Sequence, residues 1–305
     1  MVYNHIALIG LGLISSSIAL AIRRKNKRVK ITGTSRSNET RKKAHELGLC
    51  EVMETAVEAV KGAELIVLCV PVGAMASVVQ EFADKLKSGV TVTDVGSVKV
   101  EVIAKIAPLL PTNVNFIPGH PLAGTENSGP ESGFATLFDN RWCLLTPSKD
   151  CSNEPLRRLR SFWEELGAKV DEMDAERHDL VLAVTSHVPH LIAYTMVGVA
   201  DDLANITQSE VINYSAAGFR DFTRIAASDP TMWRDVFLNN KEASLEILGR
   251  FNEELTALQR AVRRGDGGFL FDYFTRTREV RRRILEAGQD IDEPNFGREK
   301  YDQDI

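Results

Sequence analysis

Short apolar runs alternate with amphipathic stretches over the first 147 residues, and this alternation constrains the fold more than any other feature. The runs IALIG, VKITGTS and ELIVLCVP are separated by SIALAIRRK and ETRKKAHELG. The pattern is typical of βαβ units, in which helices connect parallel strands. It continues with helices at 78–86 and 98–109 and strands at 90–94, 115–117 and 142–146. We therefore predict an α/β, doubly wound (Rossmann-like) N-terminal domain.

After Asp174 the strand signals nearly vanish and helical periodicity replaces them. A helix at 155–167 and a short strand in AKVDEMD come just before this change. The predicted later helices are 175–200, 211–217, 230–236, 241–264 and 268–287. We expect three parts: a dinucleotide-binding domain at 1–174, an all-α substrate and dimerisation domain at 175–288, and a polar tail at 289–305.

The composition gives no sign of nucleic-acid, membrane or metal partners. The net charge is -5 with a pI near 5.8, and the basic clusters lie among acidic neighbours. No stretch of about twenty apolar residues is free of charge, and the first residues read as a strand rather than a signal peptide. The four cysteines lack CxxC pairing and the histidines lack zinc-like spacing, so we expect reduced thiols and no metal site. A cytoplasmic protein is expected.

A glycine turn closes the first predicted strand and opens a helix. In this context Gly10 permits the turn, and Gly12 allows a pyrophosphate to approach the helix N-terminal amides. The third glycine of GxGxxG is replaced by Ser15, which is still small. The alternative is a tight turn that binds nothing. The expected dinucleotide-binding residues of this region are Gly10, Gly12, Leu13, Ile14, Val70 and Pro71.

The end of the second strand bears on the choice of dinucleotide. An acidic side chain there would accept from the ribose 2′-hydroxyl of NAD, but this chain has Ser35 and Arg36. Two donors suit a 2′-phosphate, so NADP is favoured. The alternative is that Arg36 is solvated and that NAD binds through backbone contacts.

Three further segments are rich in polar residues: 94–99, 119–129 and 218–226. The first two follow predicted strands, and open α/β sheets bind ligands beyond the carboxyl ends of their strands. Ser97 and His120 are therefore expected where nicotinamide and substrate meet. Taken alone, a loop histidine is more often a surface residue or a local hydrogen-bonding device.

The segments DVGSVK, GHPLAGTENSG, SHVPH and GFRDFTRIAASDPTMWRD follow GLGLI in this order. In these motifs the chain resembles prephenate and arogenate dehydrogenases over most of its length. The resemblance implies oxidative decarboxylation of prephenate or arogenate in tyrosine biosynthesis, with hydride transfer to NADP or NAD and a homodimer formed through the helical domain. It implies that His120 is the base on the substrate hydroxyl, assisted by Ser97, and that Arg224 grips a substrate carboxylate. Further substrate-binding positions are His190, Glu126 and Trp233.

Two departures from the family pattern lie at the cofactor site: the serines after GLGLI, and the pair Ser35-Arg36. Two alternatives compete with this interpretation. A 3-hydroxyacid or 6-phosphogluconate type dehydrogenase typically uses a lysine in its helical domain, whereas the predicted helix 175–200 has none. A non-catalytic dinucleotide sensor would bind the cofactor without turning over substrate.

Overall fold

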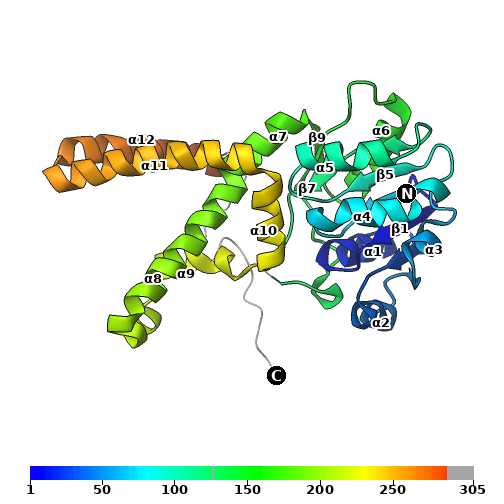
Figure 1. The fold of residues 1–305 in the computed structure, drawn as a ribbon, viewed down its shortest axis with the longest axis horizontal. Coiled ribbons are helices and arrows are strands. Elements are labelled where there is room, and N and C mark those ends of the chain that lie inside the picture. Colours follow the sequence, from blue (N-terminus) through cyan, green and yellow to red (C-terminus); the bar gives the residue numbers. More distant parts are fainter. Residues whose placement is uncertain (126, 287–305) are drawn as a thin grey trace. The chain divides into compact units, whose positions relative to one another are not determined.

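The computed structural model describes residues 1–125 and 127–286, which divide into two compact units (Figure 1). The first unit comprises Met1–Thr195 and Ile225–Ser244, and the second comprises Met196–Arg224 and the chain from Leu245 onward. The expected polar tail 289–305 lies outside the described residues.

The first unit is built on a six-stranded parallel sheet with the order β3-β2-β1-β4-β5-β6. Its strands are β1 His5–Ile9, β2 Lys30–Thr34, β3 Glu51–Val52, β4 Leu65–Leu68, β5 Thr91–Asp94 and β6 Asn115–Phe116. The chain winds outward from β1 in one direction and then returns to add β4 on the other side. This order is that of a doubly wound fold and confirms the predicted fold class.

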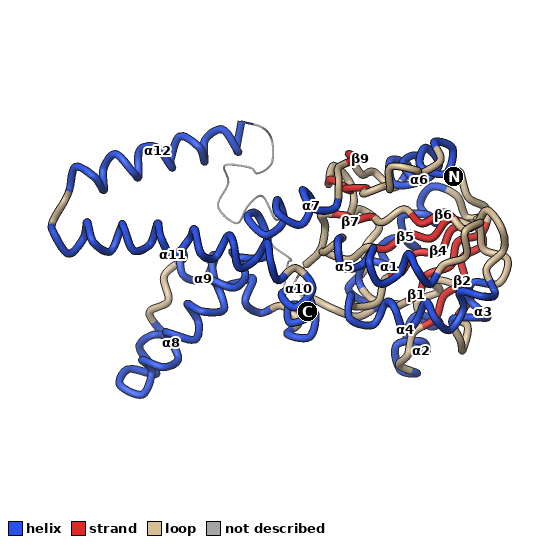
Figure 2. The backbone as a smooth tube through the Cα atoms, turned by 45° about the horizontal axis from the view of Figure 1, so that its top comes forward, coloured by secondary structure: helices blue, strands red, loops and turns tan. Residues whose placement is uncertain are grey.

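Helices cover both faces of this sheet, as the strands between helices in Figure 2 show. They are α1 Leu13–Lys25, α2 Asn38–Glu46, α3 Ala56–Val60, α4 Val72–Phe82 and α5 Val100–Ile106. Side chains of β1 alternate between the faces, because successive residues of a strand point in opposite directions. Ile6 and Leu8 pack in the core that contains α1, and Ala7 and Ile9 pack in the core that contains α3 and α4.

Helix α4 begins six residues earlier than the predicted start at 78. Pro71 precedes the helix and Gly73 lies in its first turn, and both residue types are common in loops. Proline is compatible with a helix start because the first amides of a helix have no partner within it. The prediction was therefore wrong about this boundary, and the residues after β4 belong to a helix N-terminus.

A second, three-stranded sheet follows β6. It contains β7 Gly119–Pro121, antiparallel to β8 Trp142–Leu145, which is parallel to β9 Lys169–Glu172; α6 Asn153–Glu165 connects β8 and β9. His120 was expected in a loop, but it lies within β7 and opposite Leu144. A three-residue strand with glycine and proline has no apolar run, so only its pairing with β8 identifies it.

The described chain beyond β9 is helical. Its elements are α7 Ala175–Leu182, a π-helical turn Ala183–His187, α8 Val188–Asn213, α9 Ala217–Thr223, α10 Pro230–Asn239, α11 Lys241–Arg264 and α12 Gly267–Glu286. The stretch Ala175–Asp202 is long and apolar enough to cross a membrane by length and composition alone. This is weak evidence for a span, since core helices pass the same test. The stretch buries His178, Asp179 and His187.

In the second unit, α11 and α12 form a helical hairpin. Gly265 ends α11 with a φ of 66°, and Asp266 accepts from Phe269 N at 3.0 Å at the start of α12. Both are standard devices for ending and beginning helices. Helix α12 leaves large apolar side chains exposed, with Phe271 at 71% and Phe274 at 57%.

Candidate active site

A buried ion pair ties the loop after β5 to strand β7. Asp94, the last residue of β5, and Lys99 are fully buried, and the Lys99 ammonium contacts the Asp94 carboxylate. Lys99 Nζ also donates to the Gly119 carbonyl at 2.7 Å, and Gly119 N donates to Asp94 Oδ1 at 3.3 Å. These added hydrogen bonds satisfy a pair whose burial is otherwise costly. They hold the loop that carries Ser97 beside the strand that carries His120.

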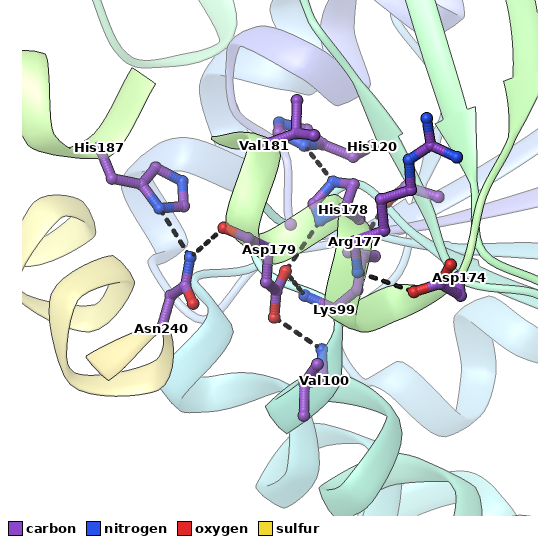
Figure 3. A network of polar contacts seen from close by, with 12 residues as sticks. Lys99, Val100, His120, Asp174, Arg177, His178, Asp179, Val181, His187 and Asn240 are labelled. Carbon is purple, nitrogen blue, oxygen red and sulfur yellow. Dashed lines mark hydrogen bonds and ion pairs between the residues drawn. The ribbon is translucent and has the colours of Figure 1, made fainter. Parts of the chain in front are cut away.

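His120 is the first member of a hydrogen-bonded chain (Figure 3). Its Nδ1 lies 2.9 Å from Nε2 of His178, and Nδ1 of His178 lies 2.8 Å from Oδ1 of Asp179. The Asp179 carboxylate accepts from the backbone N–H groups of Lys99 and Val100 at 2.8 and 2.9 Å. These amides stand at the start of α5, where a carboxylate is favourable. Strand β7 and helix α7 thus place His120 against a ring anchored to a helix N-terminus.

A second branch of the network reaches His187. Asn240 Nδ2 donates to the Asp179 carbonyl at 2.8 Å and lies 3.0 Å from Nδ1 of His187. His187 ends the π-helical turn, in which Val188 N donates to Ala183 O. Proline cannot donate within a helix, so Pro189 favours such an irregularity just before it. The predicted single helix 175–200 is therefore interrupted where its buried histidines meet the network.

Burial sets the protonation of the three clustered histidines. It lowers the pKa of His120 well below the ordinary value, and the nearby His178 and Lys99 lower it further. Burial also lowers the pKa of His178, against the opposing effect of its hydrogen bond to Asp179. The pKa of His187 falls to about 4 for the same main reason. All three rings are therefore neutral near pH 7, and a neutral imidazole can accept a proton.

His190 and Trp233 meet each other. Their rings stack with centroids 3.7 Å apart at 25°, and His190 Nδ1 lies 2.8 Å from the Ser186 carbonyl. Trp233 is 6% exposed and packs in the core that contains α4. The motifs SHVPH and DPTMWRD thus contact each other in the first unit. Trp233 is also a residue of the hydrophobic core.

The turn after β1 has the geometry of a dinucleotide cradle. Gly10 has a φ of 99°, and a Cβ there would lie 2.7 Å from the Cys69 backbone, so glycine is required. Gly12 precedes α1, and a Cβ on it would meet nothing within 4 Å. The space beside Gly12, directly before the first turn of α1, is therefore open, as close approach of a pyrophosphate requires. The half-buried Leu13, Ile14 and Val70 and the exposed Pro71 lie around this turn.

The serines that replace the family glycines fill a packed contact. Ser15, Ser16 and Ser17 are buried in α1, and Ser17 Oγ accepts from Phe134 N at 3.1 Å. A Cβ at Gly133 would lie 2.5 Å from Ser16 Cβ. Gly133 thus allows its segment to approach α1 closely at Ser16.

An arginine of α2 that was not predicted from the sequence holds the turn after β2. Ser35 is half-buried and Arg36 is exposed. Arg41, from the second turn of α2, donates through Nη1 to the carbonyls of Ser35 at 2.6 Å and Arg36 at 3.3 Å. Ser37 caps α2 by accepting from Thr40 N. The signal for Arg41 was its position four residues after this cap.

Two family models match successive parts of the chain. Residues 18–172 match the prephenate dehydrogenase nucleotide-binding domain, and residues 174–276 match the prephenate dehydrogenase dimerization domain. The chain belongs to the prephenate dehydrogenase family. It is therefore a dehydrogenase with a nucleotide-binding domain, and the resemblance found in its motifs is confirmed.

Known members of the family are similar to this protein in sequence and in structure over nearly the whole chain. A cyclohexadienyl dehydrogenase of Zymomonas mobilis is 41% identical over 92% of this chain and 96% of its own length. The structure of prephenate dehydrogenase from Aquifex aeolicus in complex with hydroxyphenyl propionate and NAD+ has a TM-score of 0.84 at 33% identity, covering 92% of this chain and 98% of that one. For arogenate dehydrogenase of Synechocystis the TM-score is 0.76 at 28% identity, covering 92% and 99%. These matches argue against the 3-hydroxyacid alternative.

Arg224 and Glu126 are the remaining residues expected to bind substrate. Arg224 is half-buried and belongs to the second unit, at the start of a short 3-10 turn after α9. Glu126 lies outside the described residues. Within residues 1–125 and 127–286, no group of three or more His, Cys, Asp or Glu side chains could hold a metal ion.

The network contains residues to which the sequence analysis gave no role. Asp94 and Lys99 lie inside the motif DVGSVK, but only Ser97 was singled out there. His178, Asp179 and Asn240 were not singled out. The available signal was the adjacent histidine and aspartate at the start of a helix, which is an unusual pair to bury.

Proposed function

We propose that this protein oxidises and decarboxylates prephenate, arogenate or both, with hydride transfer to a nicotinamide dinucleotide, in tyrosine biosynthesis. Family membership and the names of its relatives support this reaction. The observation that carries it is the pairing of His120 with His178 beside the loop that contains Ser97. This arrangement presents a neutral imidazole at the carboxyl end of the parallel sheet.

The bound dinucleotide would supply the hydride acceptor for C4 of the substrate ring. His120 accepts the proton of the 4-hydroxyl as the hydride leaves, so that positive charge does not build up at C4. The carboxylate departs as CO2, its bonding electrons complete the aromatic ring, and the proton returns to the phenolic oxygen. Ser97 holds the same hydroxyl through a second hydrogen bond. Aromatisation drives the reaction, and the side chains orient the ring.

Substrate-binding roles are proposed for four further residues. Arg224 grips a substrate carboxylate, because its planar guanidinium can make two parallel hydrogen bonds. His190, Trp233 and Glu126 orient the ring of the substrate. The stack of His190 on Trp233 supports this role for His190, since it fixes the plane of the imidazole.

The proposed cofactor is NADP, held by Gly10, Gly12, Leu13, Ile14, Val70, Pro71 and Ser97, with Ser35 and Arg36 at the 2′-phosphate. No acidic side chain stands at the end of β2 to accept from a free 2′-hydroxyl. Arg41 supports the proposal, because it adds a second guanidinium beside Ser35 and fixes the course of that turn. NAD bound through backbone contacts is the alternative.

The proposed assembly is a cytoplasmic homodimer formed through the helical domain 175–288. The match of residues 174–276 to a dimerization domain and the exposed phenylalanines of α12 support it. Apolar faces of this kind are buried in stable dimers. The proposed division at Asp174 also agrees with the junction between the two family models.

A spectrophotometric assay tests this function. Prephenate and arogenate are each paired with NADP and with NAD, and reduced dinucleotide is followed by its absorbance. We expect turnover with at least one substrate and release of CO2 in equal amount. Tight NADP binding without turnover of either substrate would overturn the proposal in favour of a dinucleotide sensor.

A further inference from the structure

Asp179 lies at the centre of the polar network, with His178 between it and His120 and with Asn240 between it and His187 (Figure 3). We infer that Asp179 and His178 are positioning residues that fix the tautomer of His120, with its proton on Nδ1 and its free lone pair on Nε2. This inference rests on the proposed function, in which His120 is the base, and it adds which ring nitrogen accepts the proton.

The direction of each hydrogen bond follows from the backbone. The amides of Lys99 and Val100 can only donate, so both oxygens of Asp179 are acceptors. Oδ1 of Asp179 lies 2.8 Å from Nδ1 of His178, and this nitrogen must therefore carry a proton. With two acceptors facing each other at that distance, the opposite tautomer would be repulsive.

The tautomer of His178 in turn determines the tautomer of His120. A neutral His178 with its proton on Nδ1 has a lone pair on Nε2, which lies 2.9 Å from Nδ1 of His120. Nδ1 of His120 must donate to it. A neutral His120 with its proton on Nδ1 has its lone pair on Nε2, the nitrogen that is not used in this chain. The backbone of α5 thus determines the reactive nitrogen of His120 through two side chains.

The same chain stabilises the product of proton transfer. When His120 accepts a proton at Nε2, it becomes an imidazolium that still donates through Nδ1 to His178. The carboxylate of Asp179 at the far end of the chain favours this positive charge in a buried setting. Lys99 opposes it, but its ammonium contacts the Asp94 carboxylate. Removing the acceptor at His178 should therefore weaken the base as well as release its ring.

The same reasoning shows that Asn240 fixes the tautomer of His187, on the other side of the network. The Nδ2 group has two protons, one directed to the Asp179 carbonyl and one to Nδ1 of His187. His187 must therefore accept at Nδ1 and carry its own proton on Nε2. The two histidines on opposite sides of Asp179 have opposite tautomers, and this difference gives the inference an internal control.

The test is 15N NMR of the histidine rings, because a ring nitrogen with a proton and one with a lone pair have well-separated chemical shifts. The full-length protein labelled at its six histidines is measured near pH 7 without substrate. His120→Asn and His187→Gln identify the two rings by the loss of their signals. We expect the proton of His120 on Nδ1 and that of His187 on Nε2. A His120 ring with its proton on Nε2 would overturn the inference.

Two variants at His178 separate tautomer control from packing. In His178→Gln the amide oxygen can reach the position of Nε2 and accept from His120, whereas His178→Leu fills the same space without an acceptor. We expect kcat to fall by about 10²-fold or more in His178→Leu, with loss of the single His120 tautomer. His178→Gln should retain the tautomer and at least about ten times the kcat of His178→Leu. Dinucleotide affinity should be unchanged in both.

The outcomes separate this inference from the proposed function. Equal losses of kcat in both variants, with the tautomer retained in both, would assign His178 to packing and overturn the inference. If His178→Leu fails to fold, the wild-type spectrum and His178→Gln still decide. A wild-type protein with the expected tautomers but no turnover would overturn the proposed function alone, and turnover with the proton of His120 on Nε2 would overturn only the inference.

Discussion

The rings of His190 and Trp233 stack face to face, with centroids 3.7 Å apart and an angle of 25° between the planes. The two residues come from helices α8 and α10 and are 43 residues apart in sequence. Trp233 also packs against the core of the parallel sheet. The stack therefore connects a side chain proposed to contact substrate with the interior of the first unit.

Replacing Trp233 should affect stability and substrate binding together. Trp233→Ala removes a buried aromatic ring, which costs about 3–5 kcal/mol of unfolding free energy, and it leaves His190 without its stacking partner. We expect a lower urea midpoint and a raised KM. Trp233→Phe is the control, because it keeps an aromatic surface and should restore most of both. A Trp233→Ala protein of unchanged stability would contradict the packing seen here.

His120→Asn should lower kcat by about 10²–10⁴, the range typical of a positioned proton acceptor, with dinucleotide affinity nearly unchanged. Because burial lowers the pKa of His120, the acid limb of kcat/KM in the wild-type enzyme should lie below pH 6.5. Steady-state kinetics over a pH series measures both. His45→Asn is the control, because it makes the same substitution at an exposed site. Near-normal turnover by His120→Asn would remove this residue from the mechanism.

Arg224→Ala should mainly raise KM, since the contact with a substrate carboxylate is made in the ground state and the transition state alike. Loss of a charge-assisted pair worth about 1.5–3 kcal/mol corresponds to roughly ten- to a hundredfold. Arg220→Ala, at an exposed position one turn earlier on α9, is the matched control and should leave KM nearly unchanged. A large loss of kcat with unchanged KM would refute this role for Arg224.

Ser35→Asp should shift the cofactor preference from NADP toward NAD. A carboxylate at this position repels a 2′-phosphate and accepts from a free 2′-hydroxyl, so the ratio of kcat/KM values should change by roughly ten- to a hundredfold. Asn38→Asp adds the same charge at an exposed site in the first turn of α2 and should have a smaller effect. A wild-type preference for NAD would show that the cofactor assignment is wrong.

Stability should fall as the pH is lowered from 6.5 toward 4. The pKa of buried His187 is about 4, whereas an unfolded histidine has a pKa near 6.5, so in this window the unfolded chain binds more protons than the folded one. The shift from 6.5 to 4 corresponds to about 3 kcal/mol, which is fully present above pH 6.5 and lost as pH falls through 4. Urea midpoints at several pH values measure this slope. His187→Gln should reduce this slope, part of which remains from His120 and His178, whereas His45→Gln should leave it unchanged. An equal slope in all three proteins would contradict the prediction.

The fold class was accessible from sequence because it depends on local periodicity. Apolar runs of strand length separated by amphipathic stretches predict β1, β2, β4 and β5 together with α1 and α2, and α11 matches its predicted bounds. Strand β7 and the start of α4 were not accessible in this way. A three-residue strand such as β7 is defined by its partner, and Pro71 and Gly73 are residue types that usually interrupt helices, which obscures the start of α4.

For the candidate site, too, the sequence predicted some features and the tertiary structure was needed for the others. Sequence motifs by themselves determined that Gly10, Ser97, His120 and Arg224 are the residues of interest and which reaction they suggest. Only the tertiary structure decided that His120 bonds to His178 and that Asp179 accepts from the amides of Lys99 and Val100, because packing of β7, α5 and α7 brings these residues together. Hydrogen-bond direction and burial depend on neighbours distant in sequence, and no local pattern encodes them.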